Sequence, residues 1–313
     1  MKVFAPASTG NVSVGFDSLG LALQSLDGDV FGDVIELQAG SNDDWLLDVT
    51  GPFADALPPD PESNIVMASC RRFERMVRAQ GKEIETLKVR LDKRLPVGSG
   101  LGSSASSIVA ALVALNRFFG GPLNRLELLE LMARMEGEIS GDVHLDNIAP
   151  SLLGGLRLCM PDGRGQYALP WPGSWQVVVA WPGTRLETKA ARDLLPERLR
   201  RETAVAHGAN FARFVHELYS GDPRDAAACL VDLIAEPWRK DLIPGFEDAR
   251  AALMKMGALA FGISGSGPTV FCVVDNSQVG KNARAWLEDN FLENERGFVR
   301  HCRADLAGAR ALP

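Results

Sequence analysis

The most constraining feature of this chain is a glycine- and serine-rich run at residues 95–106, Leu-Pro-Val-Gly-Ser-Gly-Leu-Gly-Ser-Ser-Ala-Ser. Its three glycines allow positive φ angles and a close approach of the backbone to a ligand. Successive N–H groups in such a turn can point toward one anion. The apolar residues 106–115 follow at once and predict a buried helix, whose N-terminus would add N–H groups and a favourable dipole. The run therefore predicts a phosphate-binding loop, formed by Pro96, Val97, Gly98, Ser99, Gly100, Leu101, Gly102, Ser103, Ser104, Ala105 and Ser106.

Two common phosphate-binding motifs differ from this loop. The pattern GxxxxGK[ST] needs a lysine after its last glycine, and none is present here. The dinucleotide pattern GxGxxG has another glycine spacing and an acidic residue about 20 positions later. An isolated Gly/Ser loop is often a plain connector, but this one lies between a strand pattern at 87–91 and the apolar helix. That setting favours a phosphate site.

Composition bounds the class of protein. A chain of 313 residues, 46% hydrophobic and 23% charged, can bury a large core as one domain or two joined ones. The net charge of −7 argues against nucleic-acid or anionic-membrane partners, so arginines for an anionic substrate would have to gather in one cleft. The five cysteines are scattered and never form CxxC, and the four histidines show no metal-ligand spacing. With no signal peptide or long apolar run, we expect a cytoplasmic protein with reduced thiols.

Hydrophobic periodicity predicts strands and helices in blocks rather than in strict alternation. This arrangement favours an α+β fold over a doubly wound sheet. The pattern at 258–274, a strand, a glycine loop and a strand, predicts a hairpin. The other expected strands are 30–37, 45–49, 87–91, 152–160 and 175–181, and the expected helices are 63–79, 106–115, 124–137, 201–219 and 223–235.

Two further motifs accompany the loop. Residues 5–20 read Ala-Pro-Ala-Ser-Thr-Gly-Asn-Val-Ser-Val-Gly-Phe-Asp-Ser-Leu-Gly, and residues 262–271 read Gly-Ile-Ser-Gly-Ser-Gly-Pro-Thr-Val-Phe. In this order the three motifs resemble those of the GHMP kinase superfamily, named for galacto-, homoserine, mevalonate and phosphomevalonate kinases. Within it the chain is similar from end to end to the homoserine kinases, through the segments SVGFDSLG, GDVHLDNIAP, TKAARDLLP and EPWR.

This resemblance implies a fold and an activity. The fold is a two-domain one, with an N-terminal ribosomal-protein-S5-like domain (1–160), a C-terminal ferredoxin-like domain (161–313) and the active site between them. The activity is direct in-line transfer of the γ-phosphoryl group of ATP, with Mg²⁺, to the γ-hydroxyl of L-homoserine in threonine biosynthesis. Homodimers and inhibition by threonine are common in this family. Some relatives use an Asp–Lys pair as a base, and no obvious matching lysine is seen here.

The resemblance also assigns roles to residues. Arg192 and Arg239 match arginines that bind the substrate carboxylate, a task that suits the planar guanidinium. Asn11 and Asp17 match positions of the first motif that hold the polar end of the substrate, and Thr188 matches a position near the phosphoryl acceptor. These three are also the expected catalytic residues. Further matches on the substrate side are His144, Asp146, Asn147 and Gly265, and Asn64 matches a position near the adenine.

The sequence leaves the choice of metal ligands open between neighbouring residues. Glu136 matches the carboxylate that holds Mg²⁺ together with a loop serine, either Ser103 or Ser104, and Glu138 competes with Glu136. Two other functions compete with the implied one. One is a kinase of the same superfamily acting on mevalonate, a sugar or shikimate, and the other is a non-catalytic sensor with this fold. The pair of arginines favours a carboxylate-bearing acceptor, and the intact loop favours catalysis.

Overall fold

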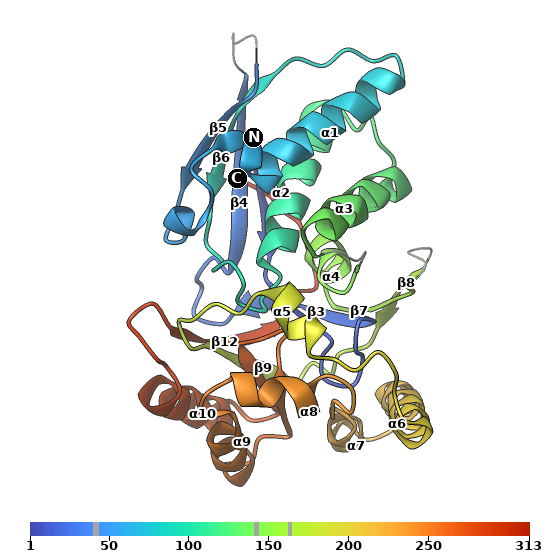
Figure 1. Ribbon diagram of the computed structural model, residues 1–313, viewed down its shortest axis with the longest axis vertical. Helices are drawn as coiled ribbons and strands as arrows, with labels where there is room; N and C mark the ends of the chain where they lie inside the picture. Colours follow the sequence, from blue (N-terminus) through green and yellow to red (C-terminus); the bar gives the residue numbers. More distant parts are fainter. Residues whose placement is uncertain (40–43, 141–143, 162–164) are drawn as a thin grey trace.

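The computed structural model describes residues 1–39, 44–140, 144–161 and 165–313. Gly141, Asp142 and Val143, which open one of the family segments, lie outside the described residues. The chain forms two lobes, each built on one sheet, stacked along the long axis of the molecule (Figure 1). Among the residues that the structure describes, no helix combines the length and apolar character needed to cross a membrane.

The first lobe contains a five-stranded sheet in the order β13-β1-β4-β6-β5, covered on one face by three helices (Figure 1). Helix α2 is central to it because its residues are buried on nearly all sides from its start through Leu115. All its strand pairs are antiparallel except β5 with β6. The elements are β1 (Lys2–Pro6), β4 (Gly32–Ala39), β5 (Leu46–Thr50), β6 (Leu87–Asp92), β13 (Arg310–Leu312), α1 (Ile65–Ala79), α2 (Ser103–Phe118) and α3 (Arg125–Ser140).

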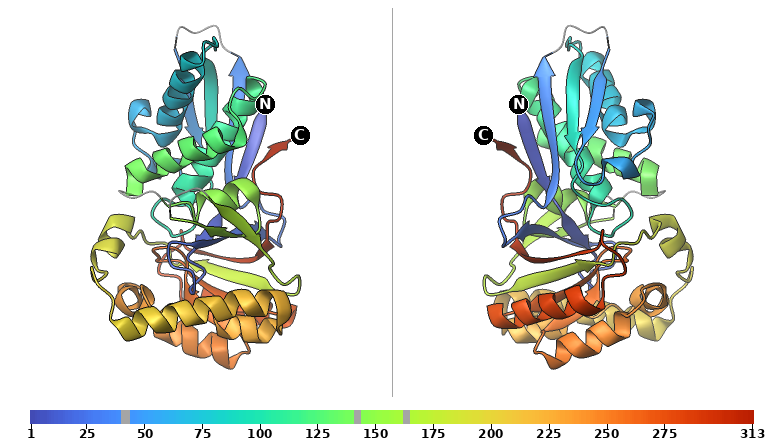
Figure 2. Two further views of the ribbon diagram at one scale, coloured as in Figure 1. Left: turned by 90° about the vertical axis from the view of Figure 1, so that its right-hand side faces the viewer. Right: turned by 90° about the vertical axis from the view of Figure 1, so that its left-hand side faces the viewer.

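The second lobe contains a sheet in the order β10-β11-β9-β12-β3-β7-β8, with β2 paired to β3. Helices α6, α7, α9 and α10 form a layer on its far side from the first lobe (Figure 2). Its elements are β2 (Ser8–Gly10), β3 (Leu19–Ser25), β7 (Leu156–Cys159), β8 (Gln166–Leu169), β9 (Gln176–Trp181), β10 (Ala260–Ile263), β11 (Val270–Val274), β12 (Phe298–Ala304), α6 (Arg201–Ser220), α7 (Pro223–Ala228), α9 (Phe246–Lys255) and α10 (Ser277–Asn290).

The two lobes exchange strands. β3, from the start of the chain, pairs with β12 in the second lobe, and β13, from its end, pairs with β1 in the first. Division of the chain at residue 160 therefore stays a prediction. Short elements complete the chain: η1 (Ala54–Ala56), η2 (Pro61–Ser63), α4 (Ile148–Leu153), α5 (Thr188–Asp193), α8 (Glu236–Arg239) and η3 (Lys240–Leu242).

The α+β class and the hairpin at 258–274 are confirmed, since β10 and β11 pair antiparallel. Two expected elements were wrong in extent. The strand expected at 152–160 begins only at 156, because α4 runs to 153 and Gly154 and Gly155 (φ +72° and +70°) separate helix from strand. The helix expected at 223–235 ends at 228. The carboxylate of Asp232 then accepts hydrogen bonds from the N–H groups of residues 234–236 and starts α8 instead.

Candidate active site

The Gly/Ser loop connects β6 to α2, and its three glycines have the expected positive φ angles. Gly98, Gly100 and Gly102 have φ angles of +67°, +81° and +63°. A Cβ atom on Gly100 would lie 2.3 Å from the carbonyl oxygen of Ser264, and one on Gly102 would lie 2.2 Å from Ser8 Oγ. Glycine is therefore required at both positions by backbone angle and by space.

Four successive carbonyl groups of the loop accept hydrogen bonds from other segments. A peptide C=O and the following N–H point in opposite directions, so anchoring the carbonyls inside the protein turns N–H groups toward the open side. The first turn of α2 adds N–H groups that have no partner within the helix. The anchors are Leu186 N to Gly98 O (3.0 Å), Thr269 N to Ser99 O (3.2 Å), Ser264 Oγ to Gly100 O (2.7 Å) and Ser8 N to Leu101 O (3.2 Å).

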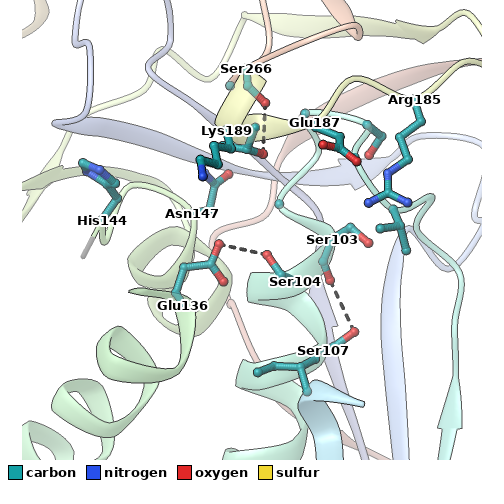
Figure 3. Close-up of a pocket in the computed structure, with 18 of the residues that line it drawn as sticks. Ser103, Ser104, Ser107, Glu136, His144, Asn147, Arg185, Glu187, Lys189 and Ser266 are labelled. Carbon is teal, nitrogen blue, oxygen red and sulfur yellow. Dashed lines mark hydrogen bonds between the residues drawn. The ribbon is translucent and has the colours of Figure 1, made fainter. Parts of the chain in front are cut away.

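These contacts bring the three sequence motifs together. The first and third motifs also bind each other, through Gly265 N to Gly10 O (3.1 Å) and Asn11 Nδ2 to Gly265 O (3.0 Å). They surround a cavity of about 620 Å³ between the lobes, shown in Figure 3. The expected site residues that line it are Asn11, Asp17, Asn64, Val97, Gly98, Ser99, Gly100, Gly102, Ser103, Ser104, Glu136, His144, Asp146, Asn147, Thr188, Arg192, Arg239 and Gly265.

Four members of the expected phosphate loop do not line the cavity: Pro96, Leu101, Ala105 and Ser106. Leu101 and Ala105 are each buried in a hydrophobic core. Ser106 Oγ donates to Ala5 O at 2.8 Å and accepts from Asp33 N at 2.9 Å. The hydroxyl of Ser106 thus joins α2 to the sheet.

Asp17 and Arg192 form a bidentate ion pair at one end of the cavity. The two N–O distances are 3.1 and 3.2 Å, and His144 Nδ1 lies 3.8 Å from the same carboxylate. Asn11 Oδ1 accepts from Asp17 N at 2.9 Å, and Asn11 and Asp17 both adopt positive φ angles. The first motif therefore holds the Asp17 carboxylate in a fixed place, although the sequence alone did not pair it with Arg192.

Arg239 is a buried cation beside this pair. Its Nε donates to Ala191 O at 3.0 Å, one NH group donates to Gly265 O at 3.3 Å, and its guanidinium lies 5.7 Å from the Phe16 ring centre. Burial lowers the pKa of Arg239, and no described carboxylate forms an ion pair with it. A buried cation without a direct ion-pair partner is costly, which favours an anionic ligand at this end of the cavity.

Glu136 and Ser104 form a polar pair at the start of α2. Ser104 Oγ donates to Glu136 Oε1 at 2.8 Å (Figure 3), whereas Ser103 Oγ donates into the protein, to Leu95 O at 3.1 Å. Glu138 instead pairs with Arg72 at the half-exposed surface. A carboxylate and a hydroxyl beside a phosphate loop are the kind of donor set that Mg²⁺ binds together with phosphate oxygens and water. Among the described residues no group of three His, Cys, Asp or Glu side chains is placed to hold a metal ion, and this type of site does not need one.

The same corner holds a second carboxyl group with altered acidity. Burial raises the pKa of Glu136 to about 7. Burial, with smaller contributions from Asp17 and Glu136, raises the pKa of Asp146 to about 7. Carboxylates crowded in a buried corner favour binding of a cation, such as a metal ion or an ammonium group.

We expect the raised pKa of Glu136 to affect how the stability of the protein depends on pH. The unfolded chain loses the Glu136 proton near pH 4.5, whereas the folded protein keeps it up to about pH 7. Ionisation therefore costs the wild type stability as pH rises through this window, by up to about 3 kcal/mol at 1.4 kcal/mol per pKa unit. Glu136→Gln lacks this cost. In urea unfolding without ligands, its free energy of unfolding relative to that of the wild type should therefore rise between pH 5 and 8. Parallel curves would contradict the burial of an ionisable Glu136.

Sequence reasoning missed a buried ion pair beneath the loop. Lys93, 1% exposed, lies 2.5 Å from Asp33 Oδ2 and donates to Ser103 O and to Ser107 Oγ. Asp33 Oδ1 accepts from the N–H groups of residues 94 and 95. The pair therefore joins the entry of the loop to the first turn of α2. A signal existed, because the alternation of β6 places residues 87, 89 and 91 inside and 93 continues that face.

Lysines do reach the cavity, although the sequence showed no obvious match to a lysine base. Lys93 lines the cavity but is held by Asp33. Lys189 also lines it, as do Arg185, Glu187 and Ser266, none of which the sequence analysis singled out. Thr188 lies at the same wall, with its Oγ1 3.4 Å from Ser266 Oγ.

The fold and cavity define a phosphotransferase class: a glycine loop at a helix start faces a pocket of opposed charges between two lobes. Family models agree. The model of the GHMP kinases N terminal domain matches residues 64–155, and that of the GHMP kinases C terminal domain matches residues 214–291. The chain belongs to the GHMP kinase family.

Solved structures add detail. Homoserine kinase from Cytophaga hutchinsonii is 32% identical, with a TM-score of 0.88, and the match covers 100% of this chain and 97% of that one. A putative homoserine kinase from Listeria monocytogenes is 21% identical, with a TM-score of 0.73 and coverage of 100% and 99%. Mevalonate kinase from Methanococcus jannaschii is 14% identical, with a TM-score of 0.72 and coverage of 97% and 98%. The last two likenesses show the fold alone.

Proposed function

We propose that this kinase transfers the γ-phosphoryl group of ATP to the γ-hydroxyl of L-homoserine, forming O-phospho-L-homoserine, the reaction that threonine biosynthesis uses. The observation that carries the proposal is the charge pattern at the acceptor end, where Arg192 and Arg239 lie beside Asp17 and Asp146. Homoserine carries a carboxylate and an ammonium group next to each other, so its binding site needs both positive and negative side chains. The 32% identity to the Cytophaga enzyme supports the same acceptor.

In this proposal the acceptor binds by exchange of ion pairs. The buried guanidinium of Arg239, joined by Arg192, binds the carboxylate bidentately. The ammonium group lies against Asp146 and the Asp17 carboxylate that Arg192 gives up. Asn11, Asn147, His144 and Thr188 then direct the hydroxyl toward the phosphate loop. In the part of the chain that the structure describes, no lysine forms an ion pair with Asp17, so positioning and charge neutralisation account for most of the rate.

The nucleotide occupies the other end of the cavity. Its phosphates bind N–H groups of the Gly/Ser loop and of the first turn of α2, and its base lies near Asn64, whose Oδ1 caps α1 through Val66 N at 2.9 Å. Glu136 and Ser104 hold Mg²⁺. When bound, this ion neutralises charge on the phosphates and orients the transferred group. We place the whole reaction between the N- and C-terminal halves of the chain, divided near residue 160.

The wider setting is also part of the proposal. All five cysteines are free and buried, which suits a reducing compartment, and we propose a cytoplasmic location. A homodimer and inhibition by threonine remain expectations carried by the family resemblance. An oligomer measurement and a threonine titration of the activity test them.

An acceptor panel tests the substrate. With Mg-ATP, consumption of ATP should be fastest with L-homoserine and near background with mevalonate, galactose and shikimate. Equal rates with mevalonate or galactose would remove homoserine as the acceptor. A single-turnover assay with wild-type protein in excess separates a kinase from a non-catalytic sensor, which would leave the γ-phosphate on ATP.

Replacement of Arg239 by glutamine should raise KM for L-homoserine by roughly 10- to 100-fold, since a charged hydrogen-bonded pair is worth about 1.5–3 kcal/mol. The matched substrate is L-homoserinol, which has the ammonium and hydroxyl groups but no carboxylate. Arg239→Gln should therefore lower kcat/KM for L-homoserine but leave kcat/KM for homoserinol nearly unchanged. An equal loss with both acceptors would show that Arg239 does not bind the carboxylate.

A further inference from the structure

The segment between β9 and α5 lies directly on the phosphate loop. Leu186 N donates to Gly98 O at 3.0 Å. A Cβ atom on Gly98 would come within 2.5 Å of Arg185 Cγ and 3.0 Å of Arg185 Nε, so the Arg185 stem rests on the Gly98 α-carbon. This contact fixes where the side chain leaves the segment. Figure 3 shows its guanidinium on the phosphate-loop side of the cavity, directed toward the Ser103 end of α2.

Arg185 forms no ion pair with any residue that the structure describes. Among the residues that the structure describes, no carboxylate lies within 4.0 Å of its guanidinium, although Glu187 lines the same cavity. Arg192, only seven positions later, is paired with Asp17. The protein carries 40 acidic and 33 basic residues, so a general excess of positive charge does not account for this cation. An unpaired guanidinium beside a loop that presents N–H groups suits an anion bound to that loop.

We propose that Arg185 binds the phosphate chain of the nucleotide directly and stabilises its charge during transfer. This inference rests on the proposed kinase function but not on the identity of the acceptor. Glu136 and Ser104 lie on one flank of the α2 N-terminus and Arg185 on the other (Figure 3). The phosphate chain would then lie between the metal-binding pair and the guanidinium. A planar guanidinium can donate two parallel hydrogen bonds to phosphate oxygens, which a point charge cannot do.

Nucleotide titrations without acceptor test the proposal. Arg185→Met keeps the stem that lies on Gly98 and removes the charge. We expect its affinity for Mg-ATP in calorimetric titration to fall by roughly 10- to 100-fold, while its affinity for adenosine stays that of the wild type. The melting temperature should not change, because no ion pair is lost. The matched control is Arg198→Met, in the exposed connection between α5 and α6 and not among the cavity-lining residues, which should bind both ligands as the wild type does.

Two results would overturn the proposal. One is wild-type affinity of Arg185→Met for Mg-ATP, and the other is an equal loss of affinity for Mg-ATP and adenosine. Partial recovery in Arg185→Lys would support a contact that depends on charge. Because no acceptor is present in these titrations, a wrong choice of acceptor leaves their outcome intact. The acceptor panel tests that choice by itself.

Discussion

Glu136→Gln should lower kcat by about 10²- to 10³-fold, the usual cost of losing one group that stabilises charge in the transition state. The amide is nearly the same size as the carboxyl and can still accept the hydrogen bond from Ser104 Oγ. Burial already disfavours the charged form of Glu136, so the variant should fold at least as stably as the wild type at pH 8. Initial rates at saturating ATP and acceptor, with a thermal melt of each protein, measure both effects.

Glu138→Gln is the matched control. Glu138 lies two positions later on the same helix, but its carboxylate pairs with Arg72 at the surface. An exposed pair of this kind contributes about 0–1 kcal/mol, so both activity and stability should stay close to the wild type. If Glu138→Gln lost activity and Glu136→Gln kept it, the metal site would lie elsewhere on the helix than we propose.

Lys93→Met should lower the free energy of unfolding by about 3–5 kcal/mol. Removal of one partner leaves the Asp33 carboxylate buried without its counter-ion, which is the costly way to break a buried pair. Asp33 would keep its bonds from the N–H groups of residues 94 and 95 and from Ser107 Oγ, so the fold should weaken rather than collapse. Urea unfolding followed by circular dichroism measures the difference.

Two further variants show whether the charge is the cause. Lys93→Met combined with Asp33→Asn removes both charges and should recover a large part of the loss. Lys88→Met, on the same strand but outside the buried face, should change stability by no more than about 0.5 kcal/mol. A loss below about 1 kcal/mol in Lys93→Met alone would mean that the ion pair does not support the loop.

Local patterns carried the prediction of the helices α1, α2, α3, α6 and α7 and of the phosphate loop, whereas α9 and α10 were not expected. The loop was predictable because its glycines, its apolar helix and the preceding strand adjoin each other in sequence. The strands β1, β2 and β3 were not expected, because the first motif hides them among glycines and serines. Their partners are also remote: β3 pairs with β12 and β1 with β13, and no local pattern encodes such a pairing.

The candidate site also contains residues that the sequence predicts and residues that it does not. Residues within the motifs, such as Asn11, Ser104 and Gly265, could be predicted to line it. Their partners could not, because the Asp17–Arg192 ion pair joins residues 175 positions apart and the Lys93–Asp33 pair joins residues 60 positions apart. Arg185 has no motif of its own, and only the contact of its stem with Gly98 distinguishes it from an ordinary surface arginine.

The most direct test of the account is identification of the phosphorylated product. Wild-type protein would be incubated with Mg-ATP and L-homoserine, and the mixture followed by ³¹P NMR and mass spectrometry. The account predicts a new phosphate monoester with the mass of O-phospho-L-homoserine, formed in step with ADP and about 10²- to 10³-fold more slowly with Glu136→Gln. Hydrolysis of ATP to ADP and inorganic phosphate without that ester, or phosphorylation of mevalonate in preference to homoserine, would contradict it.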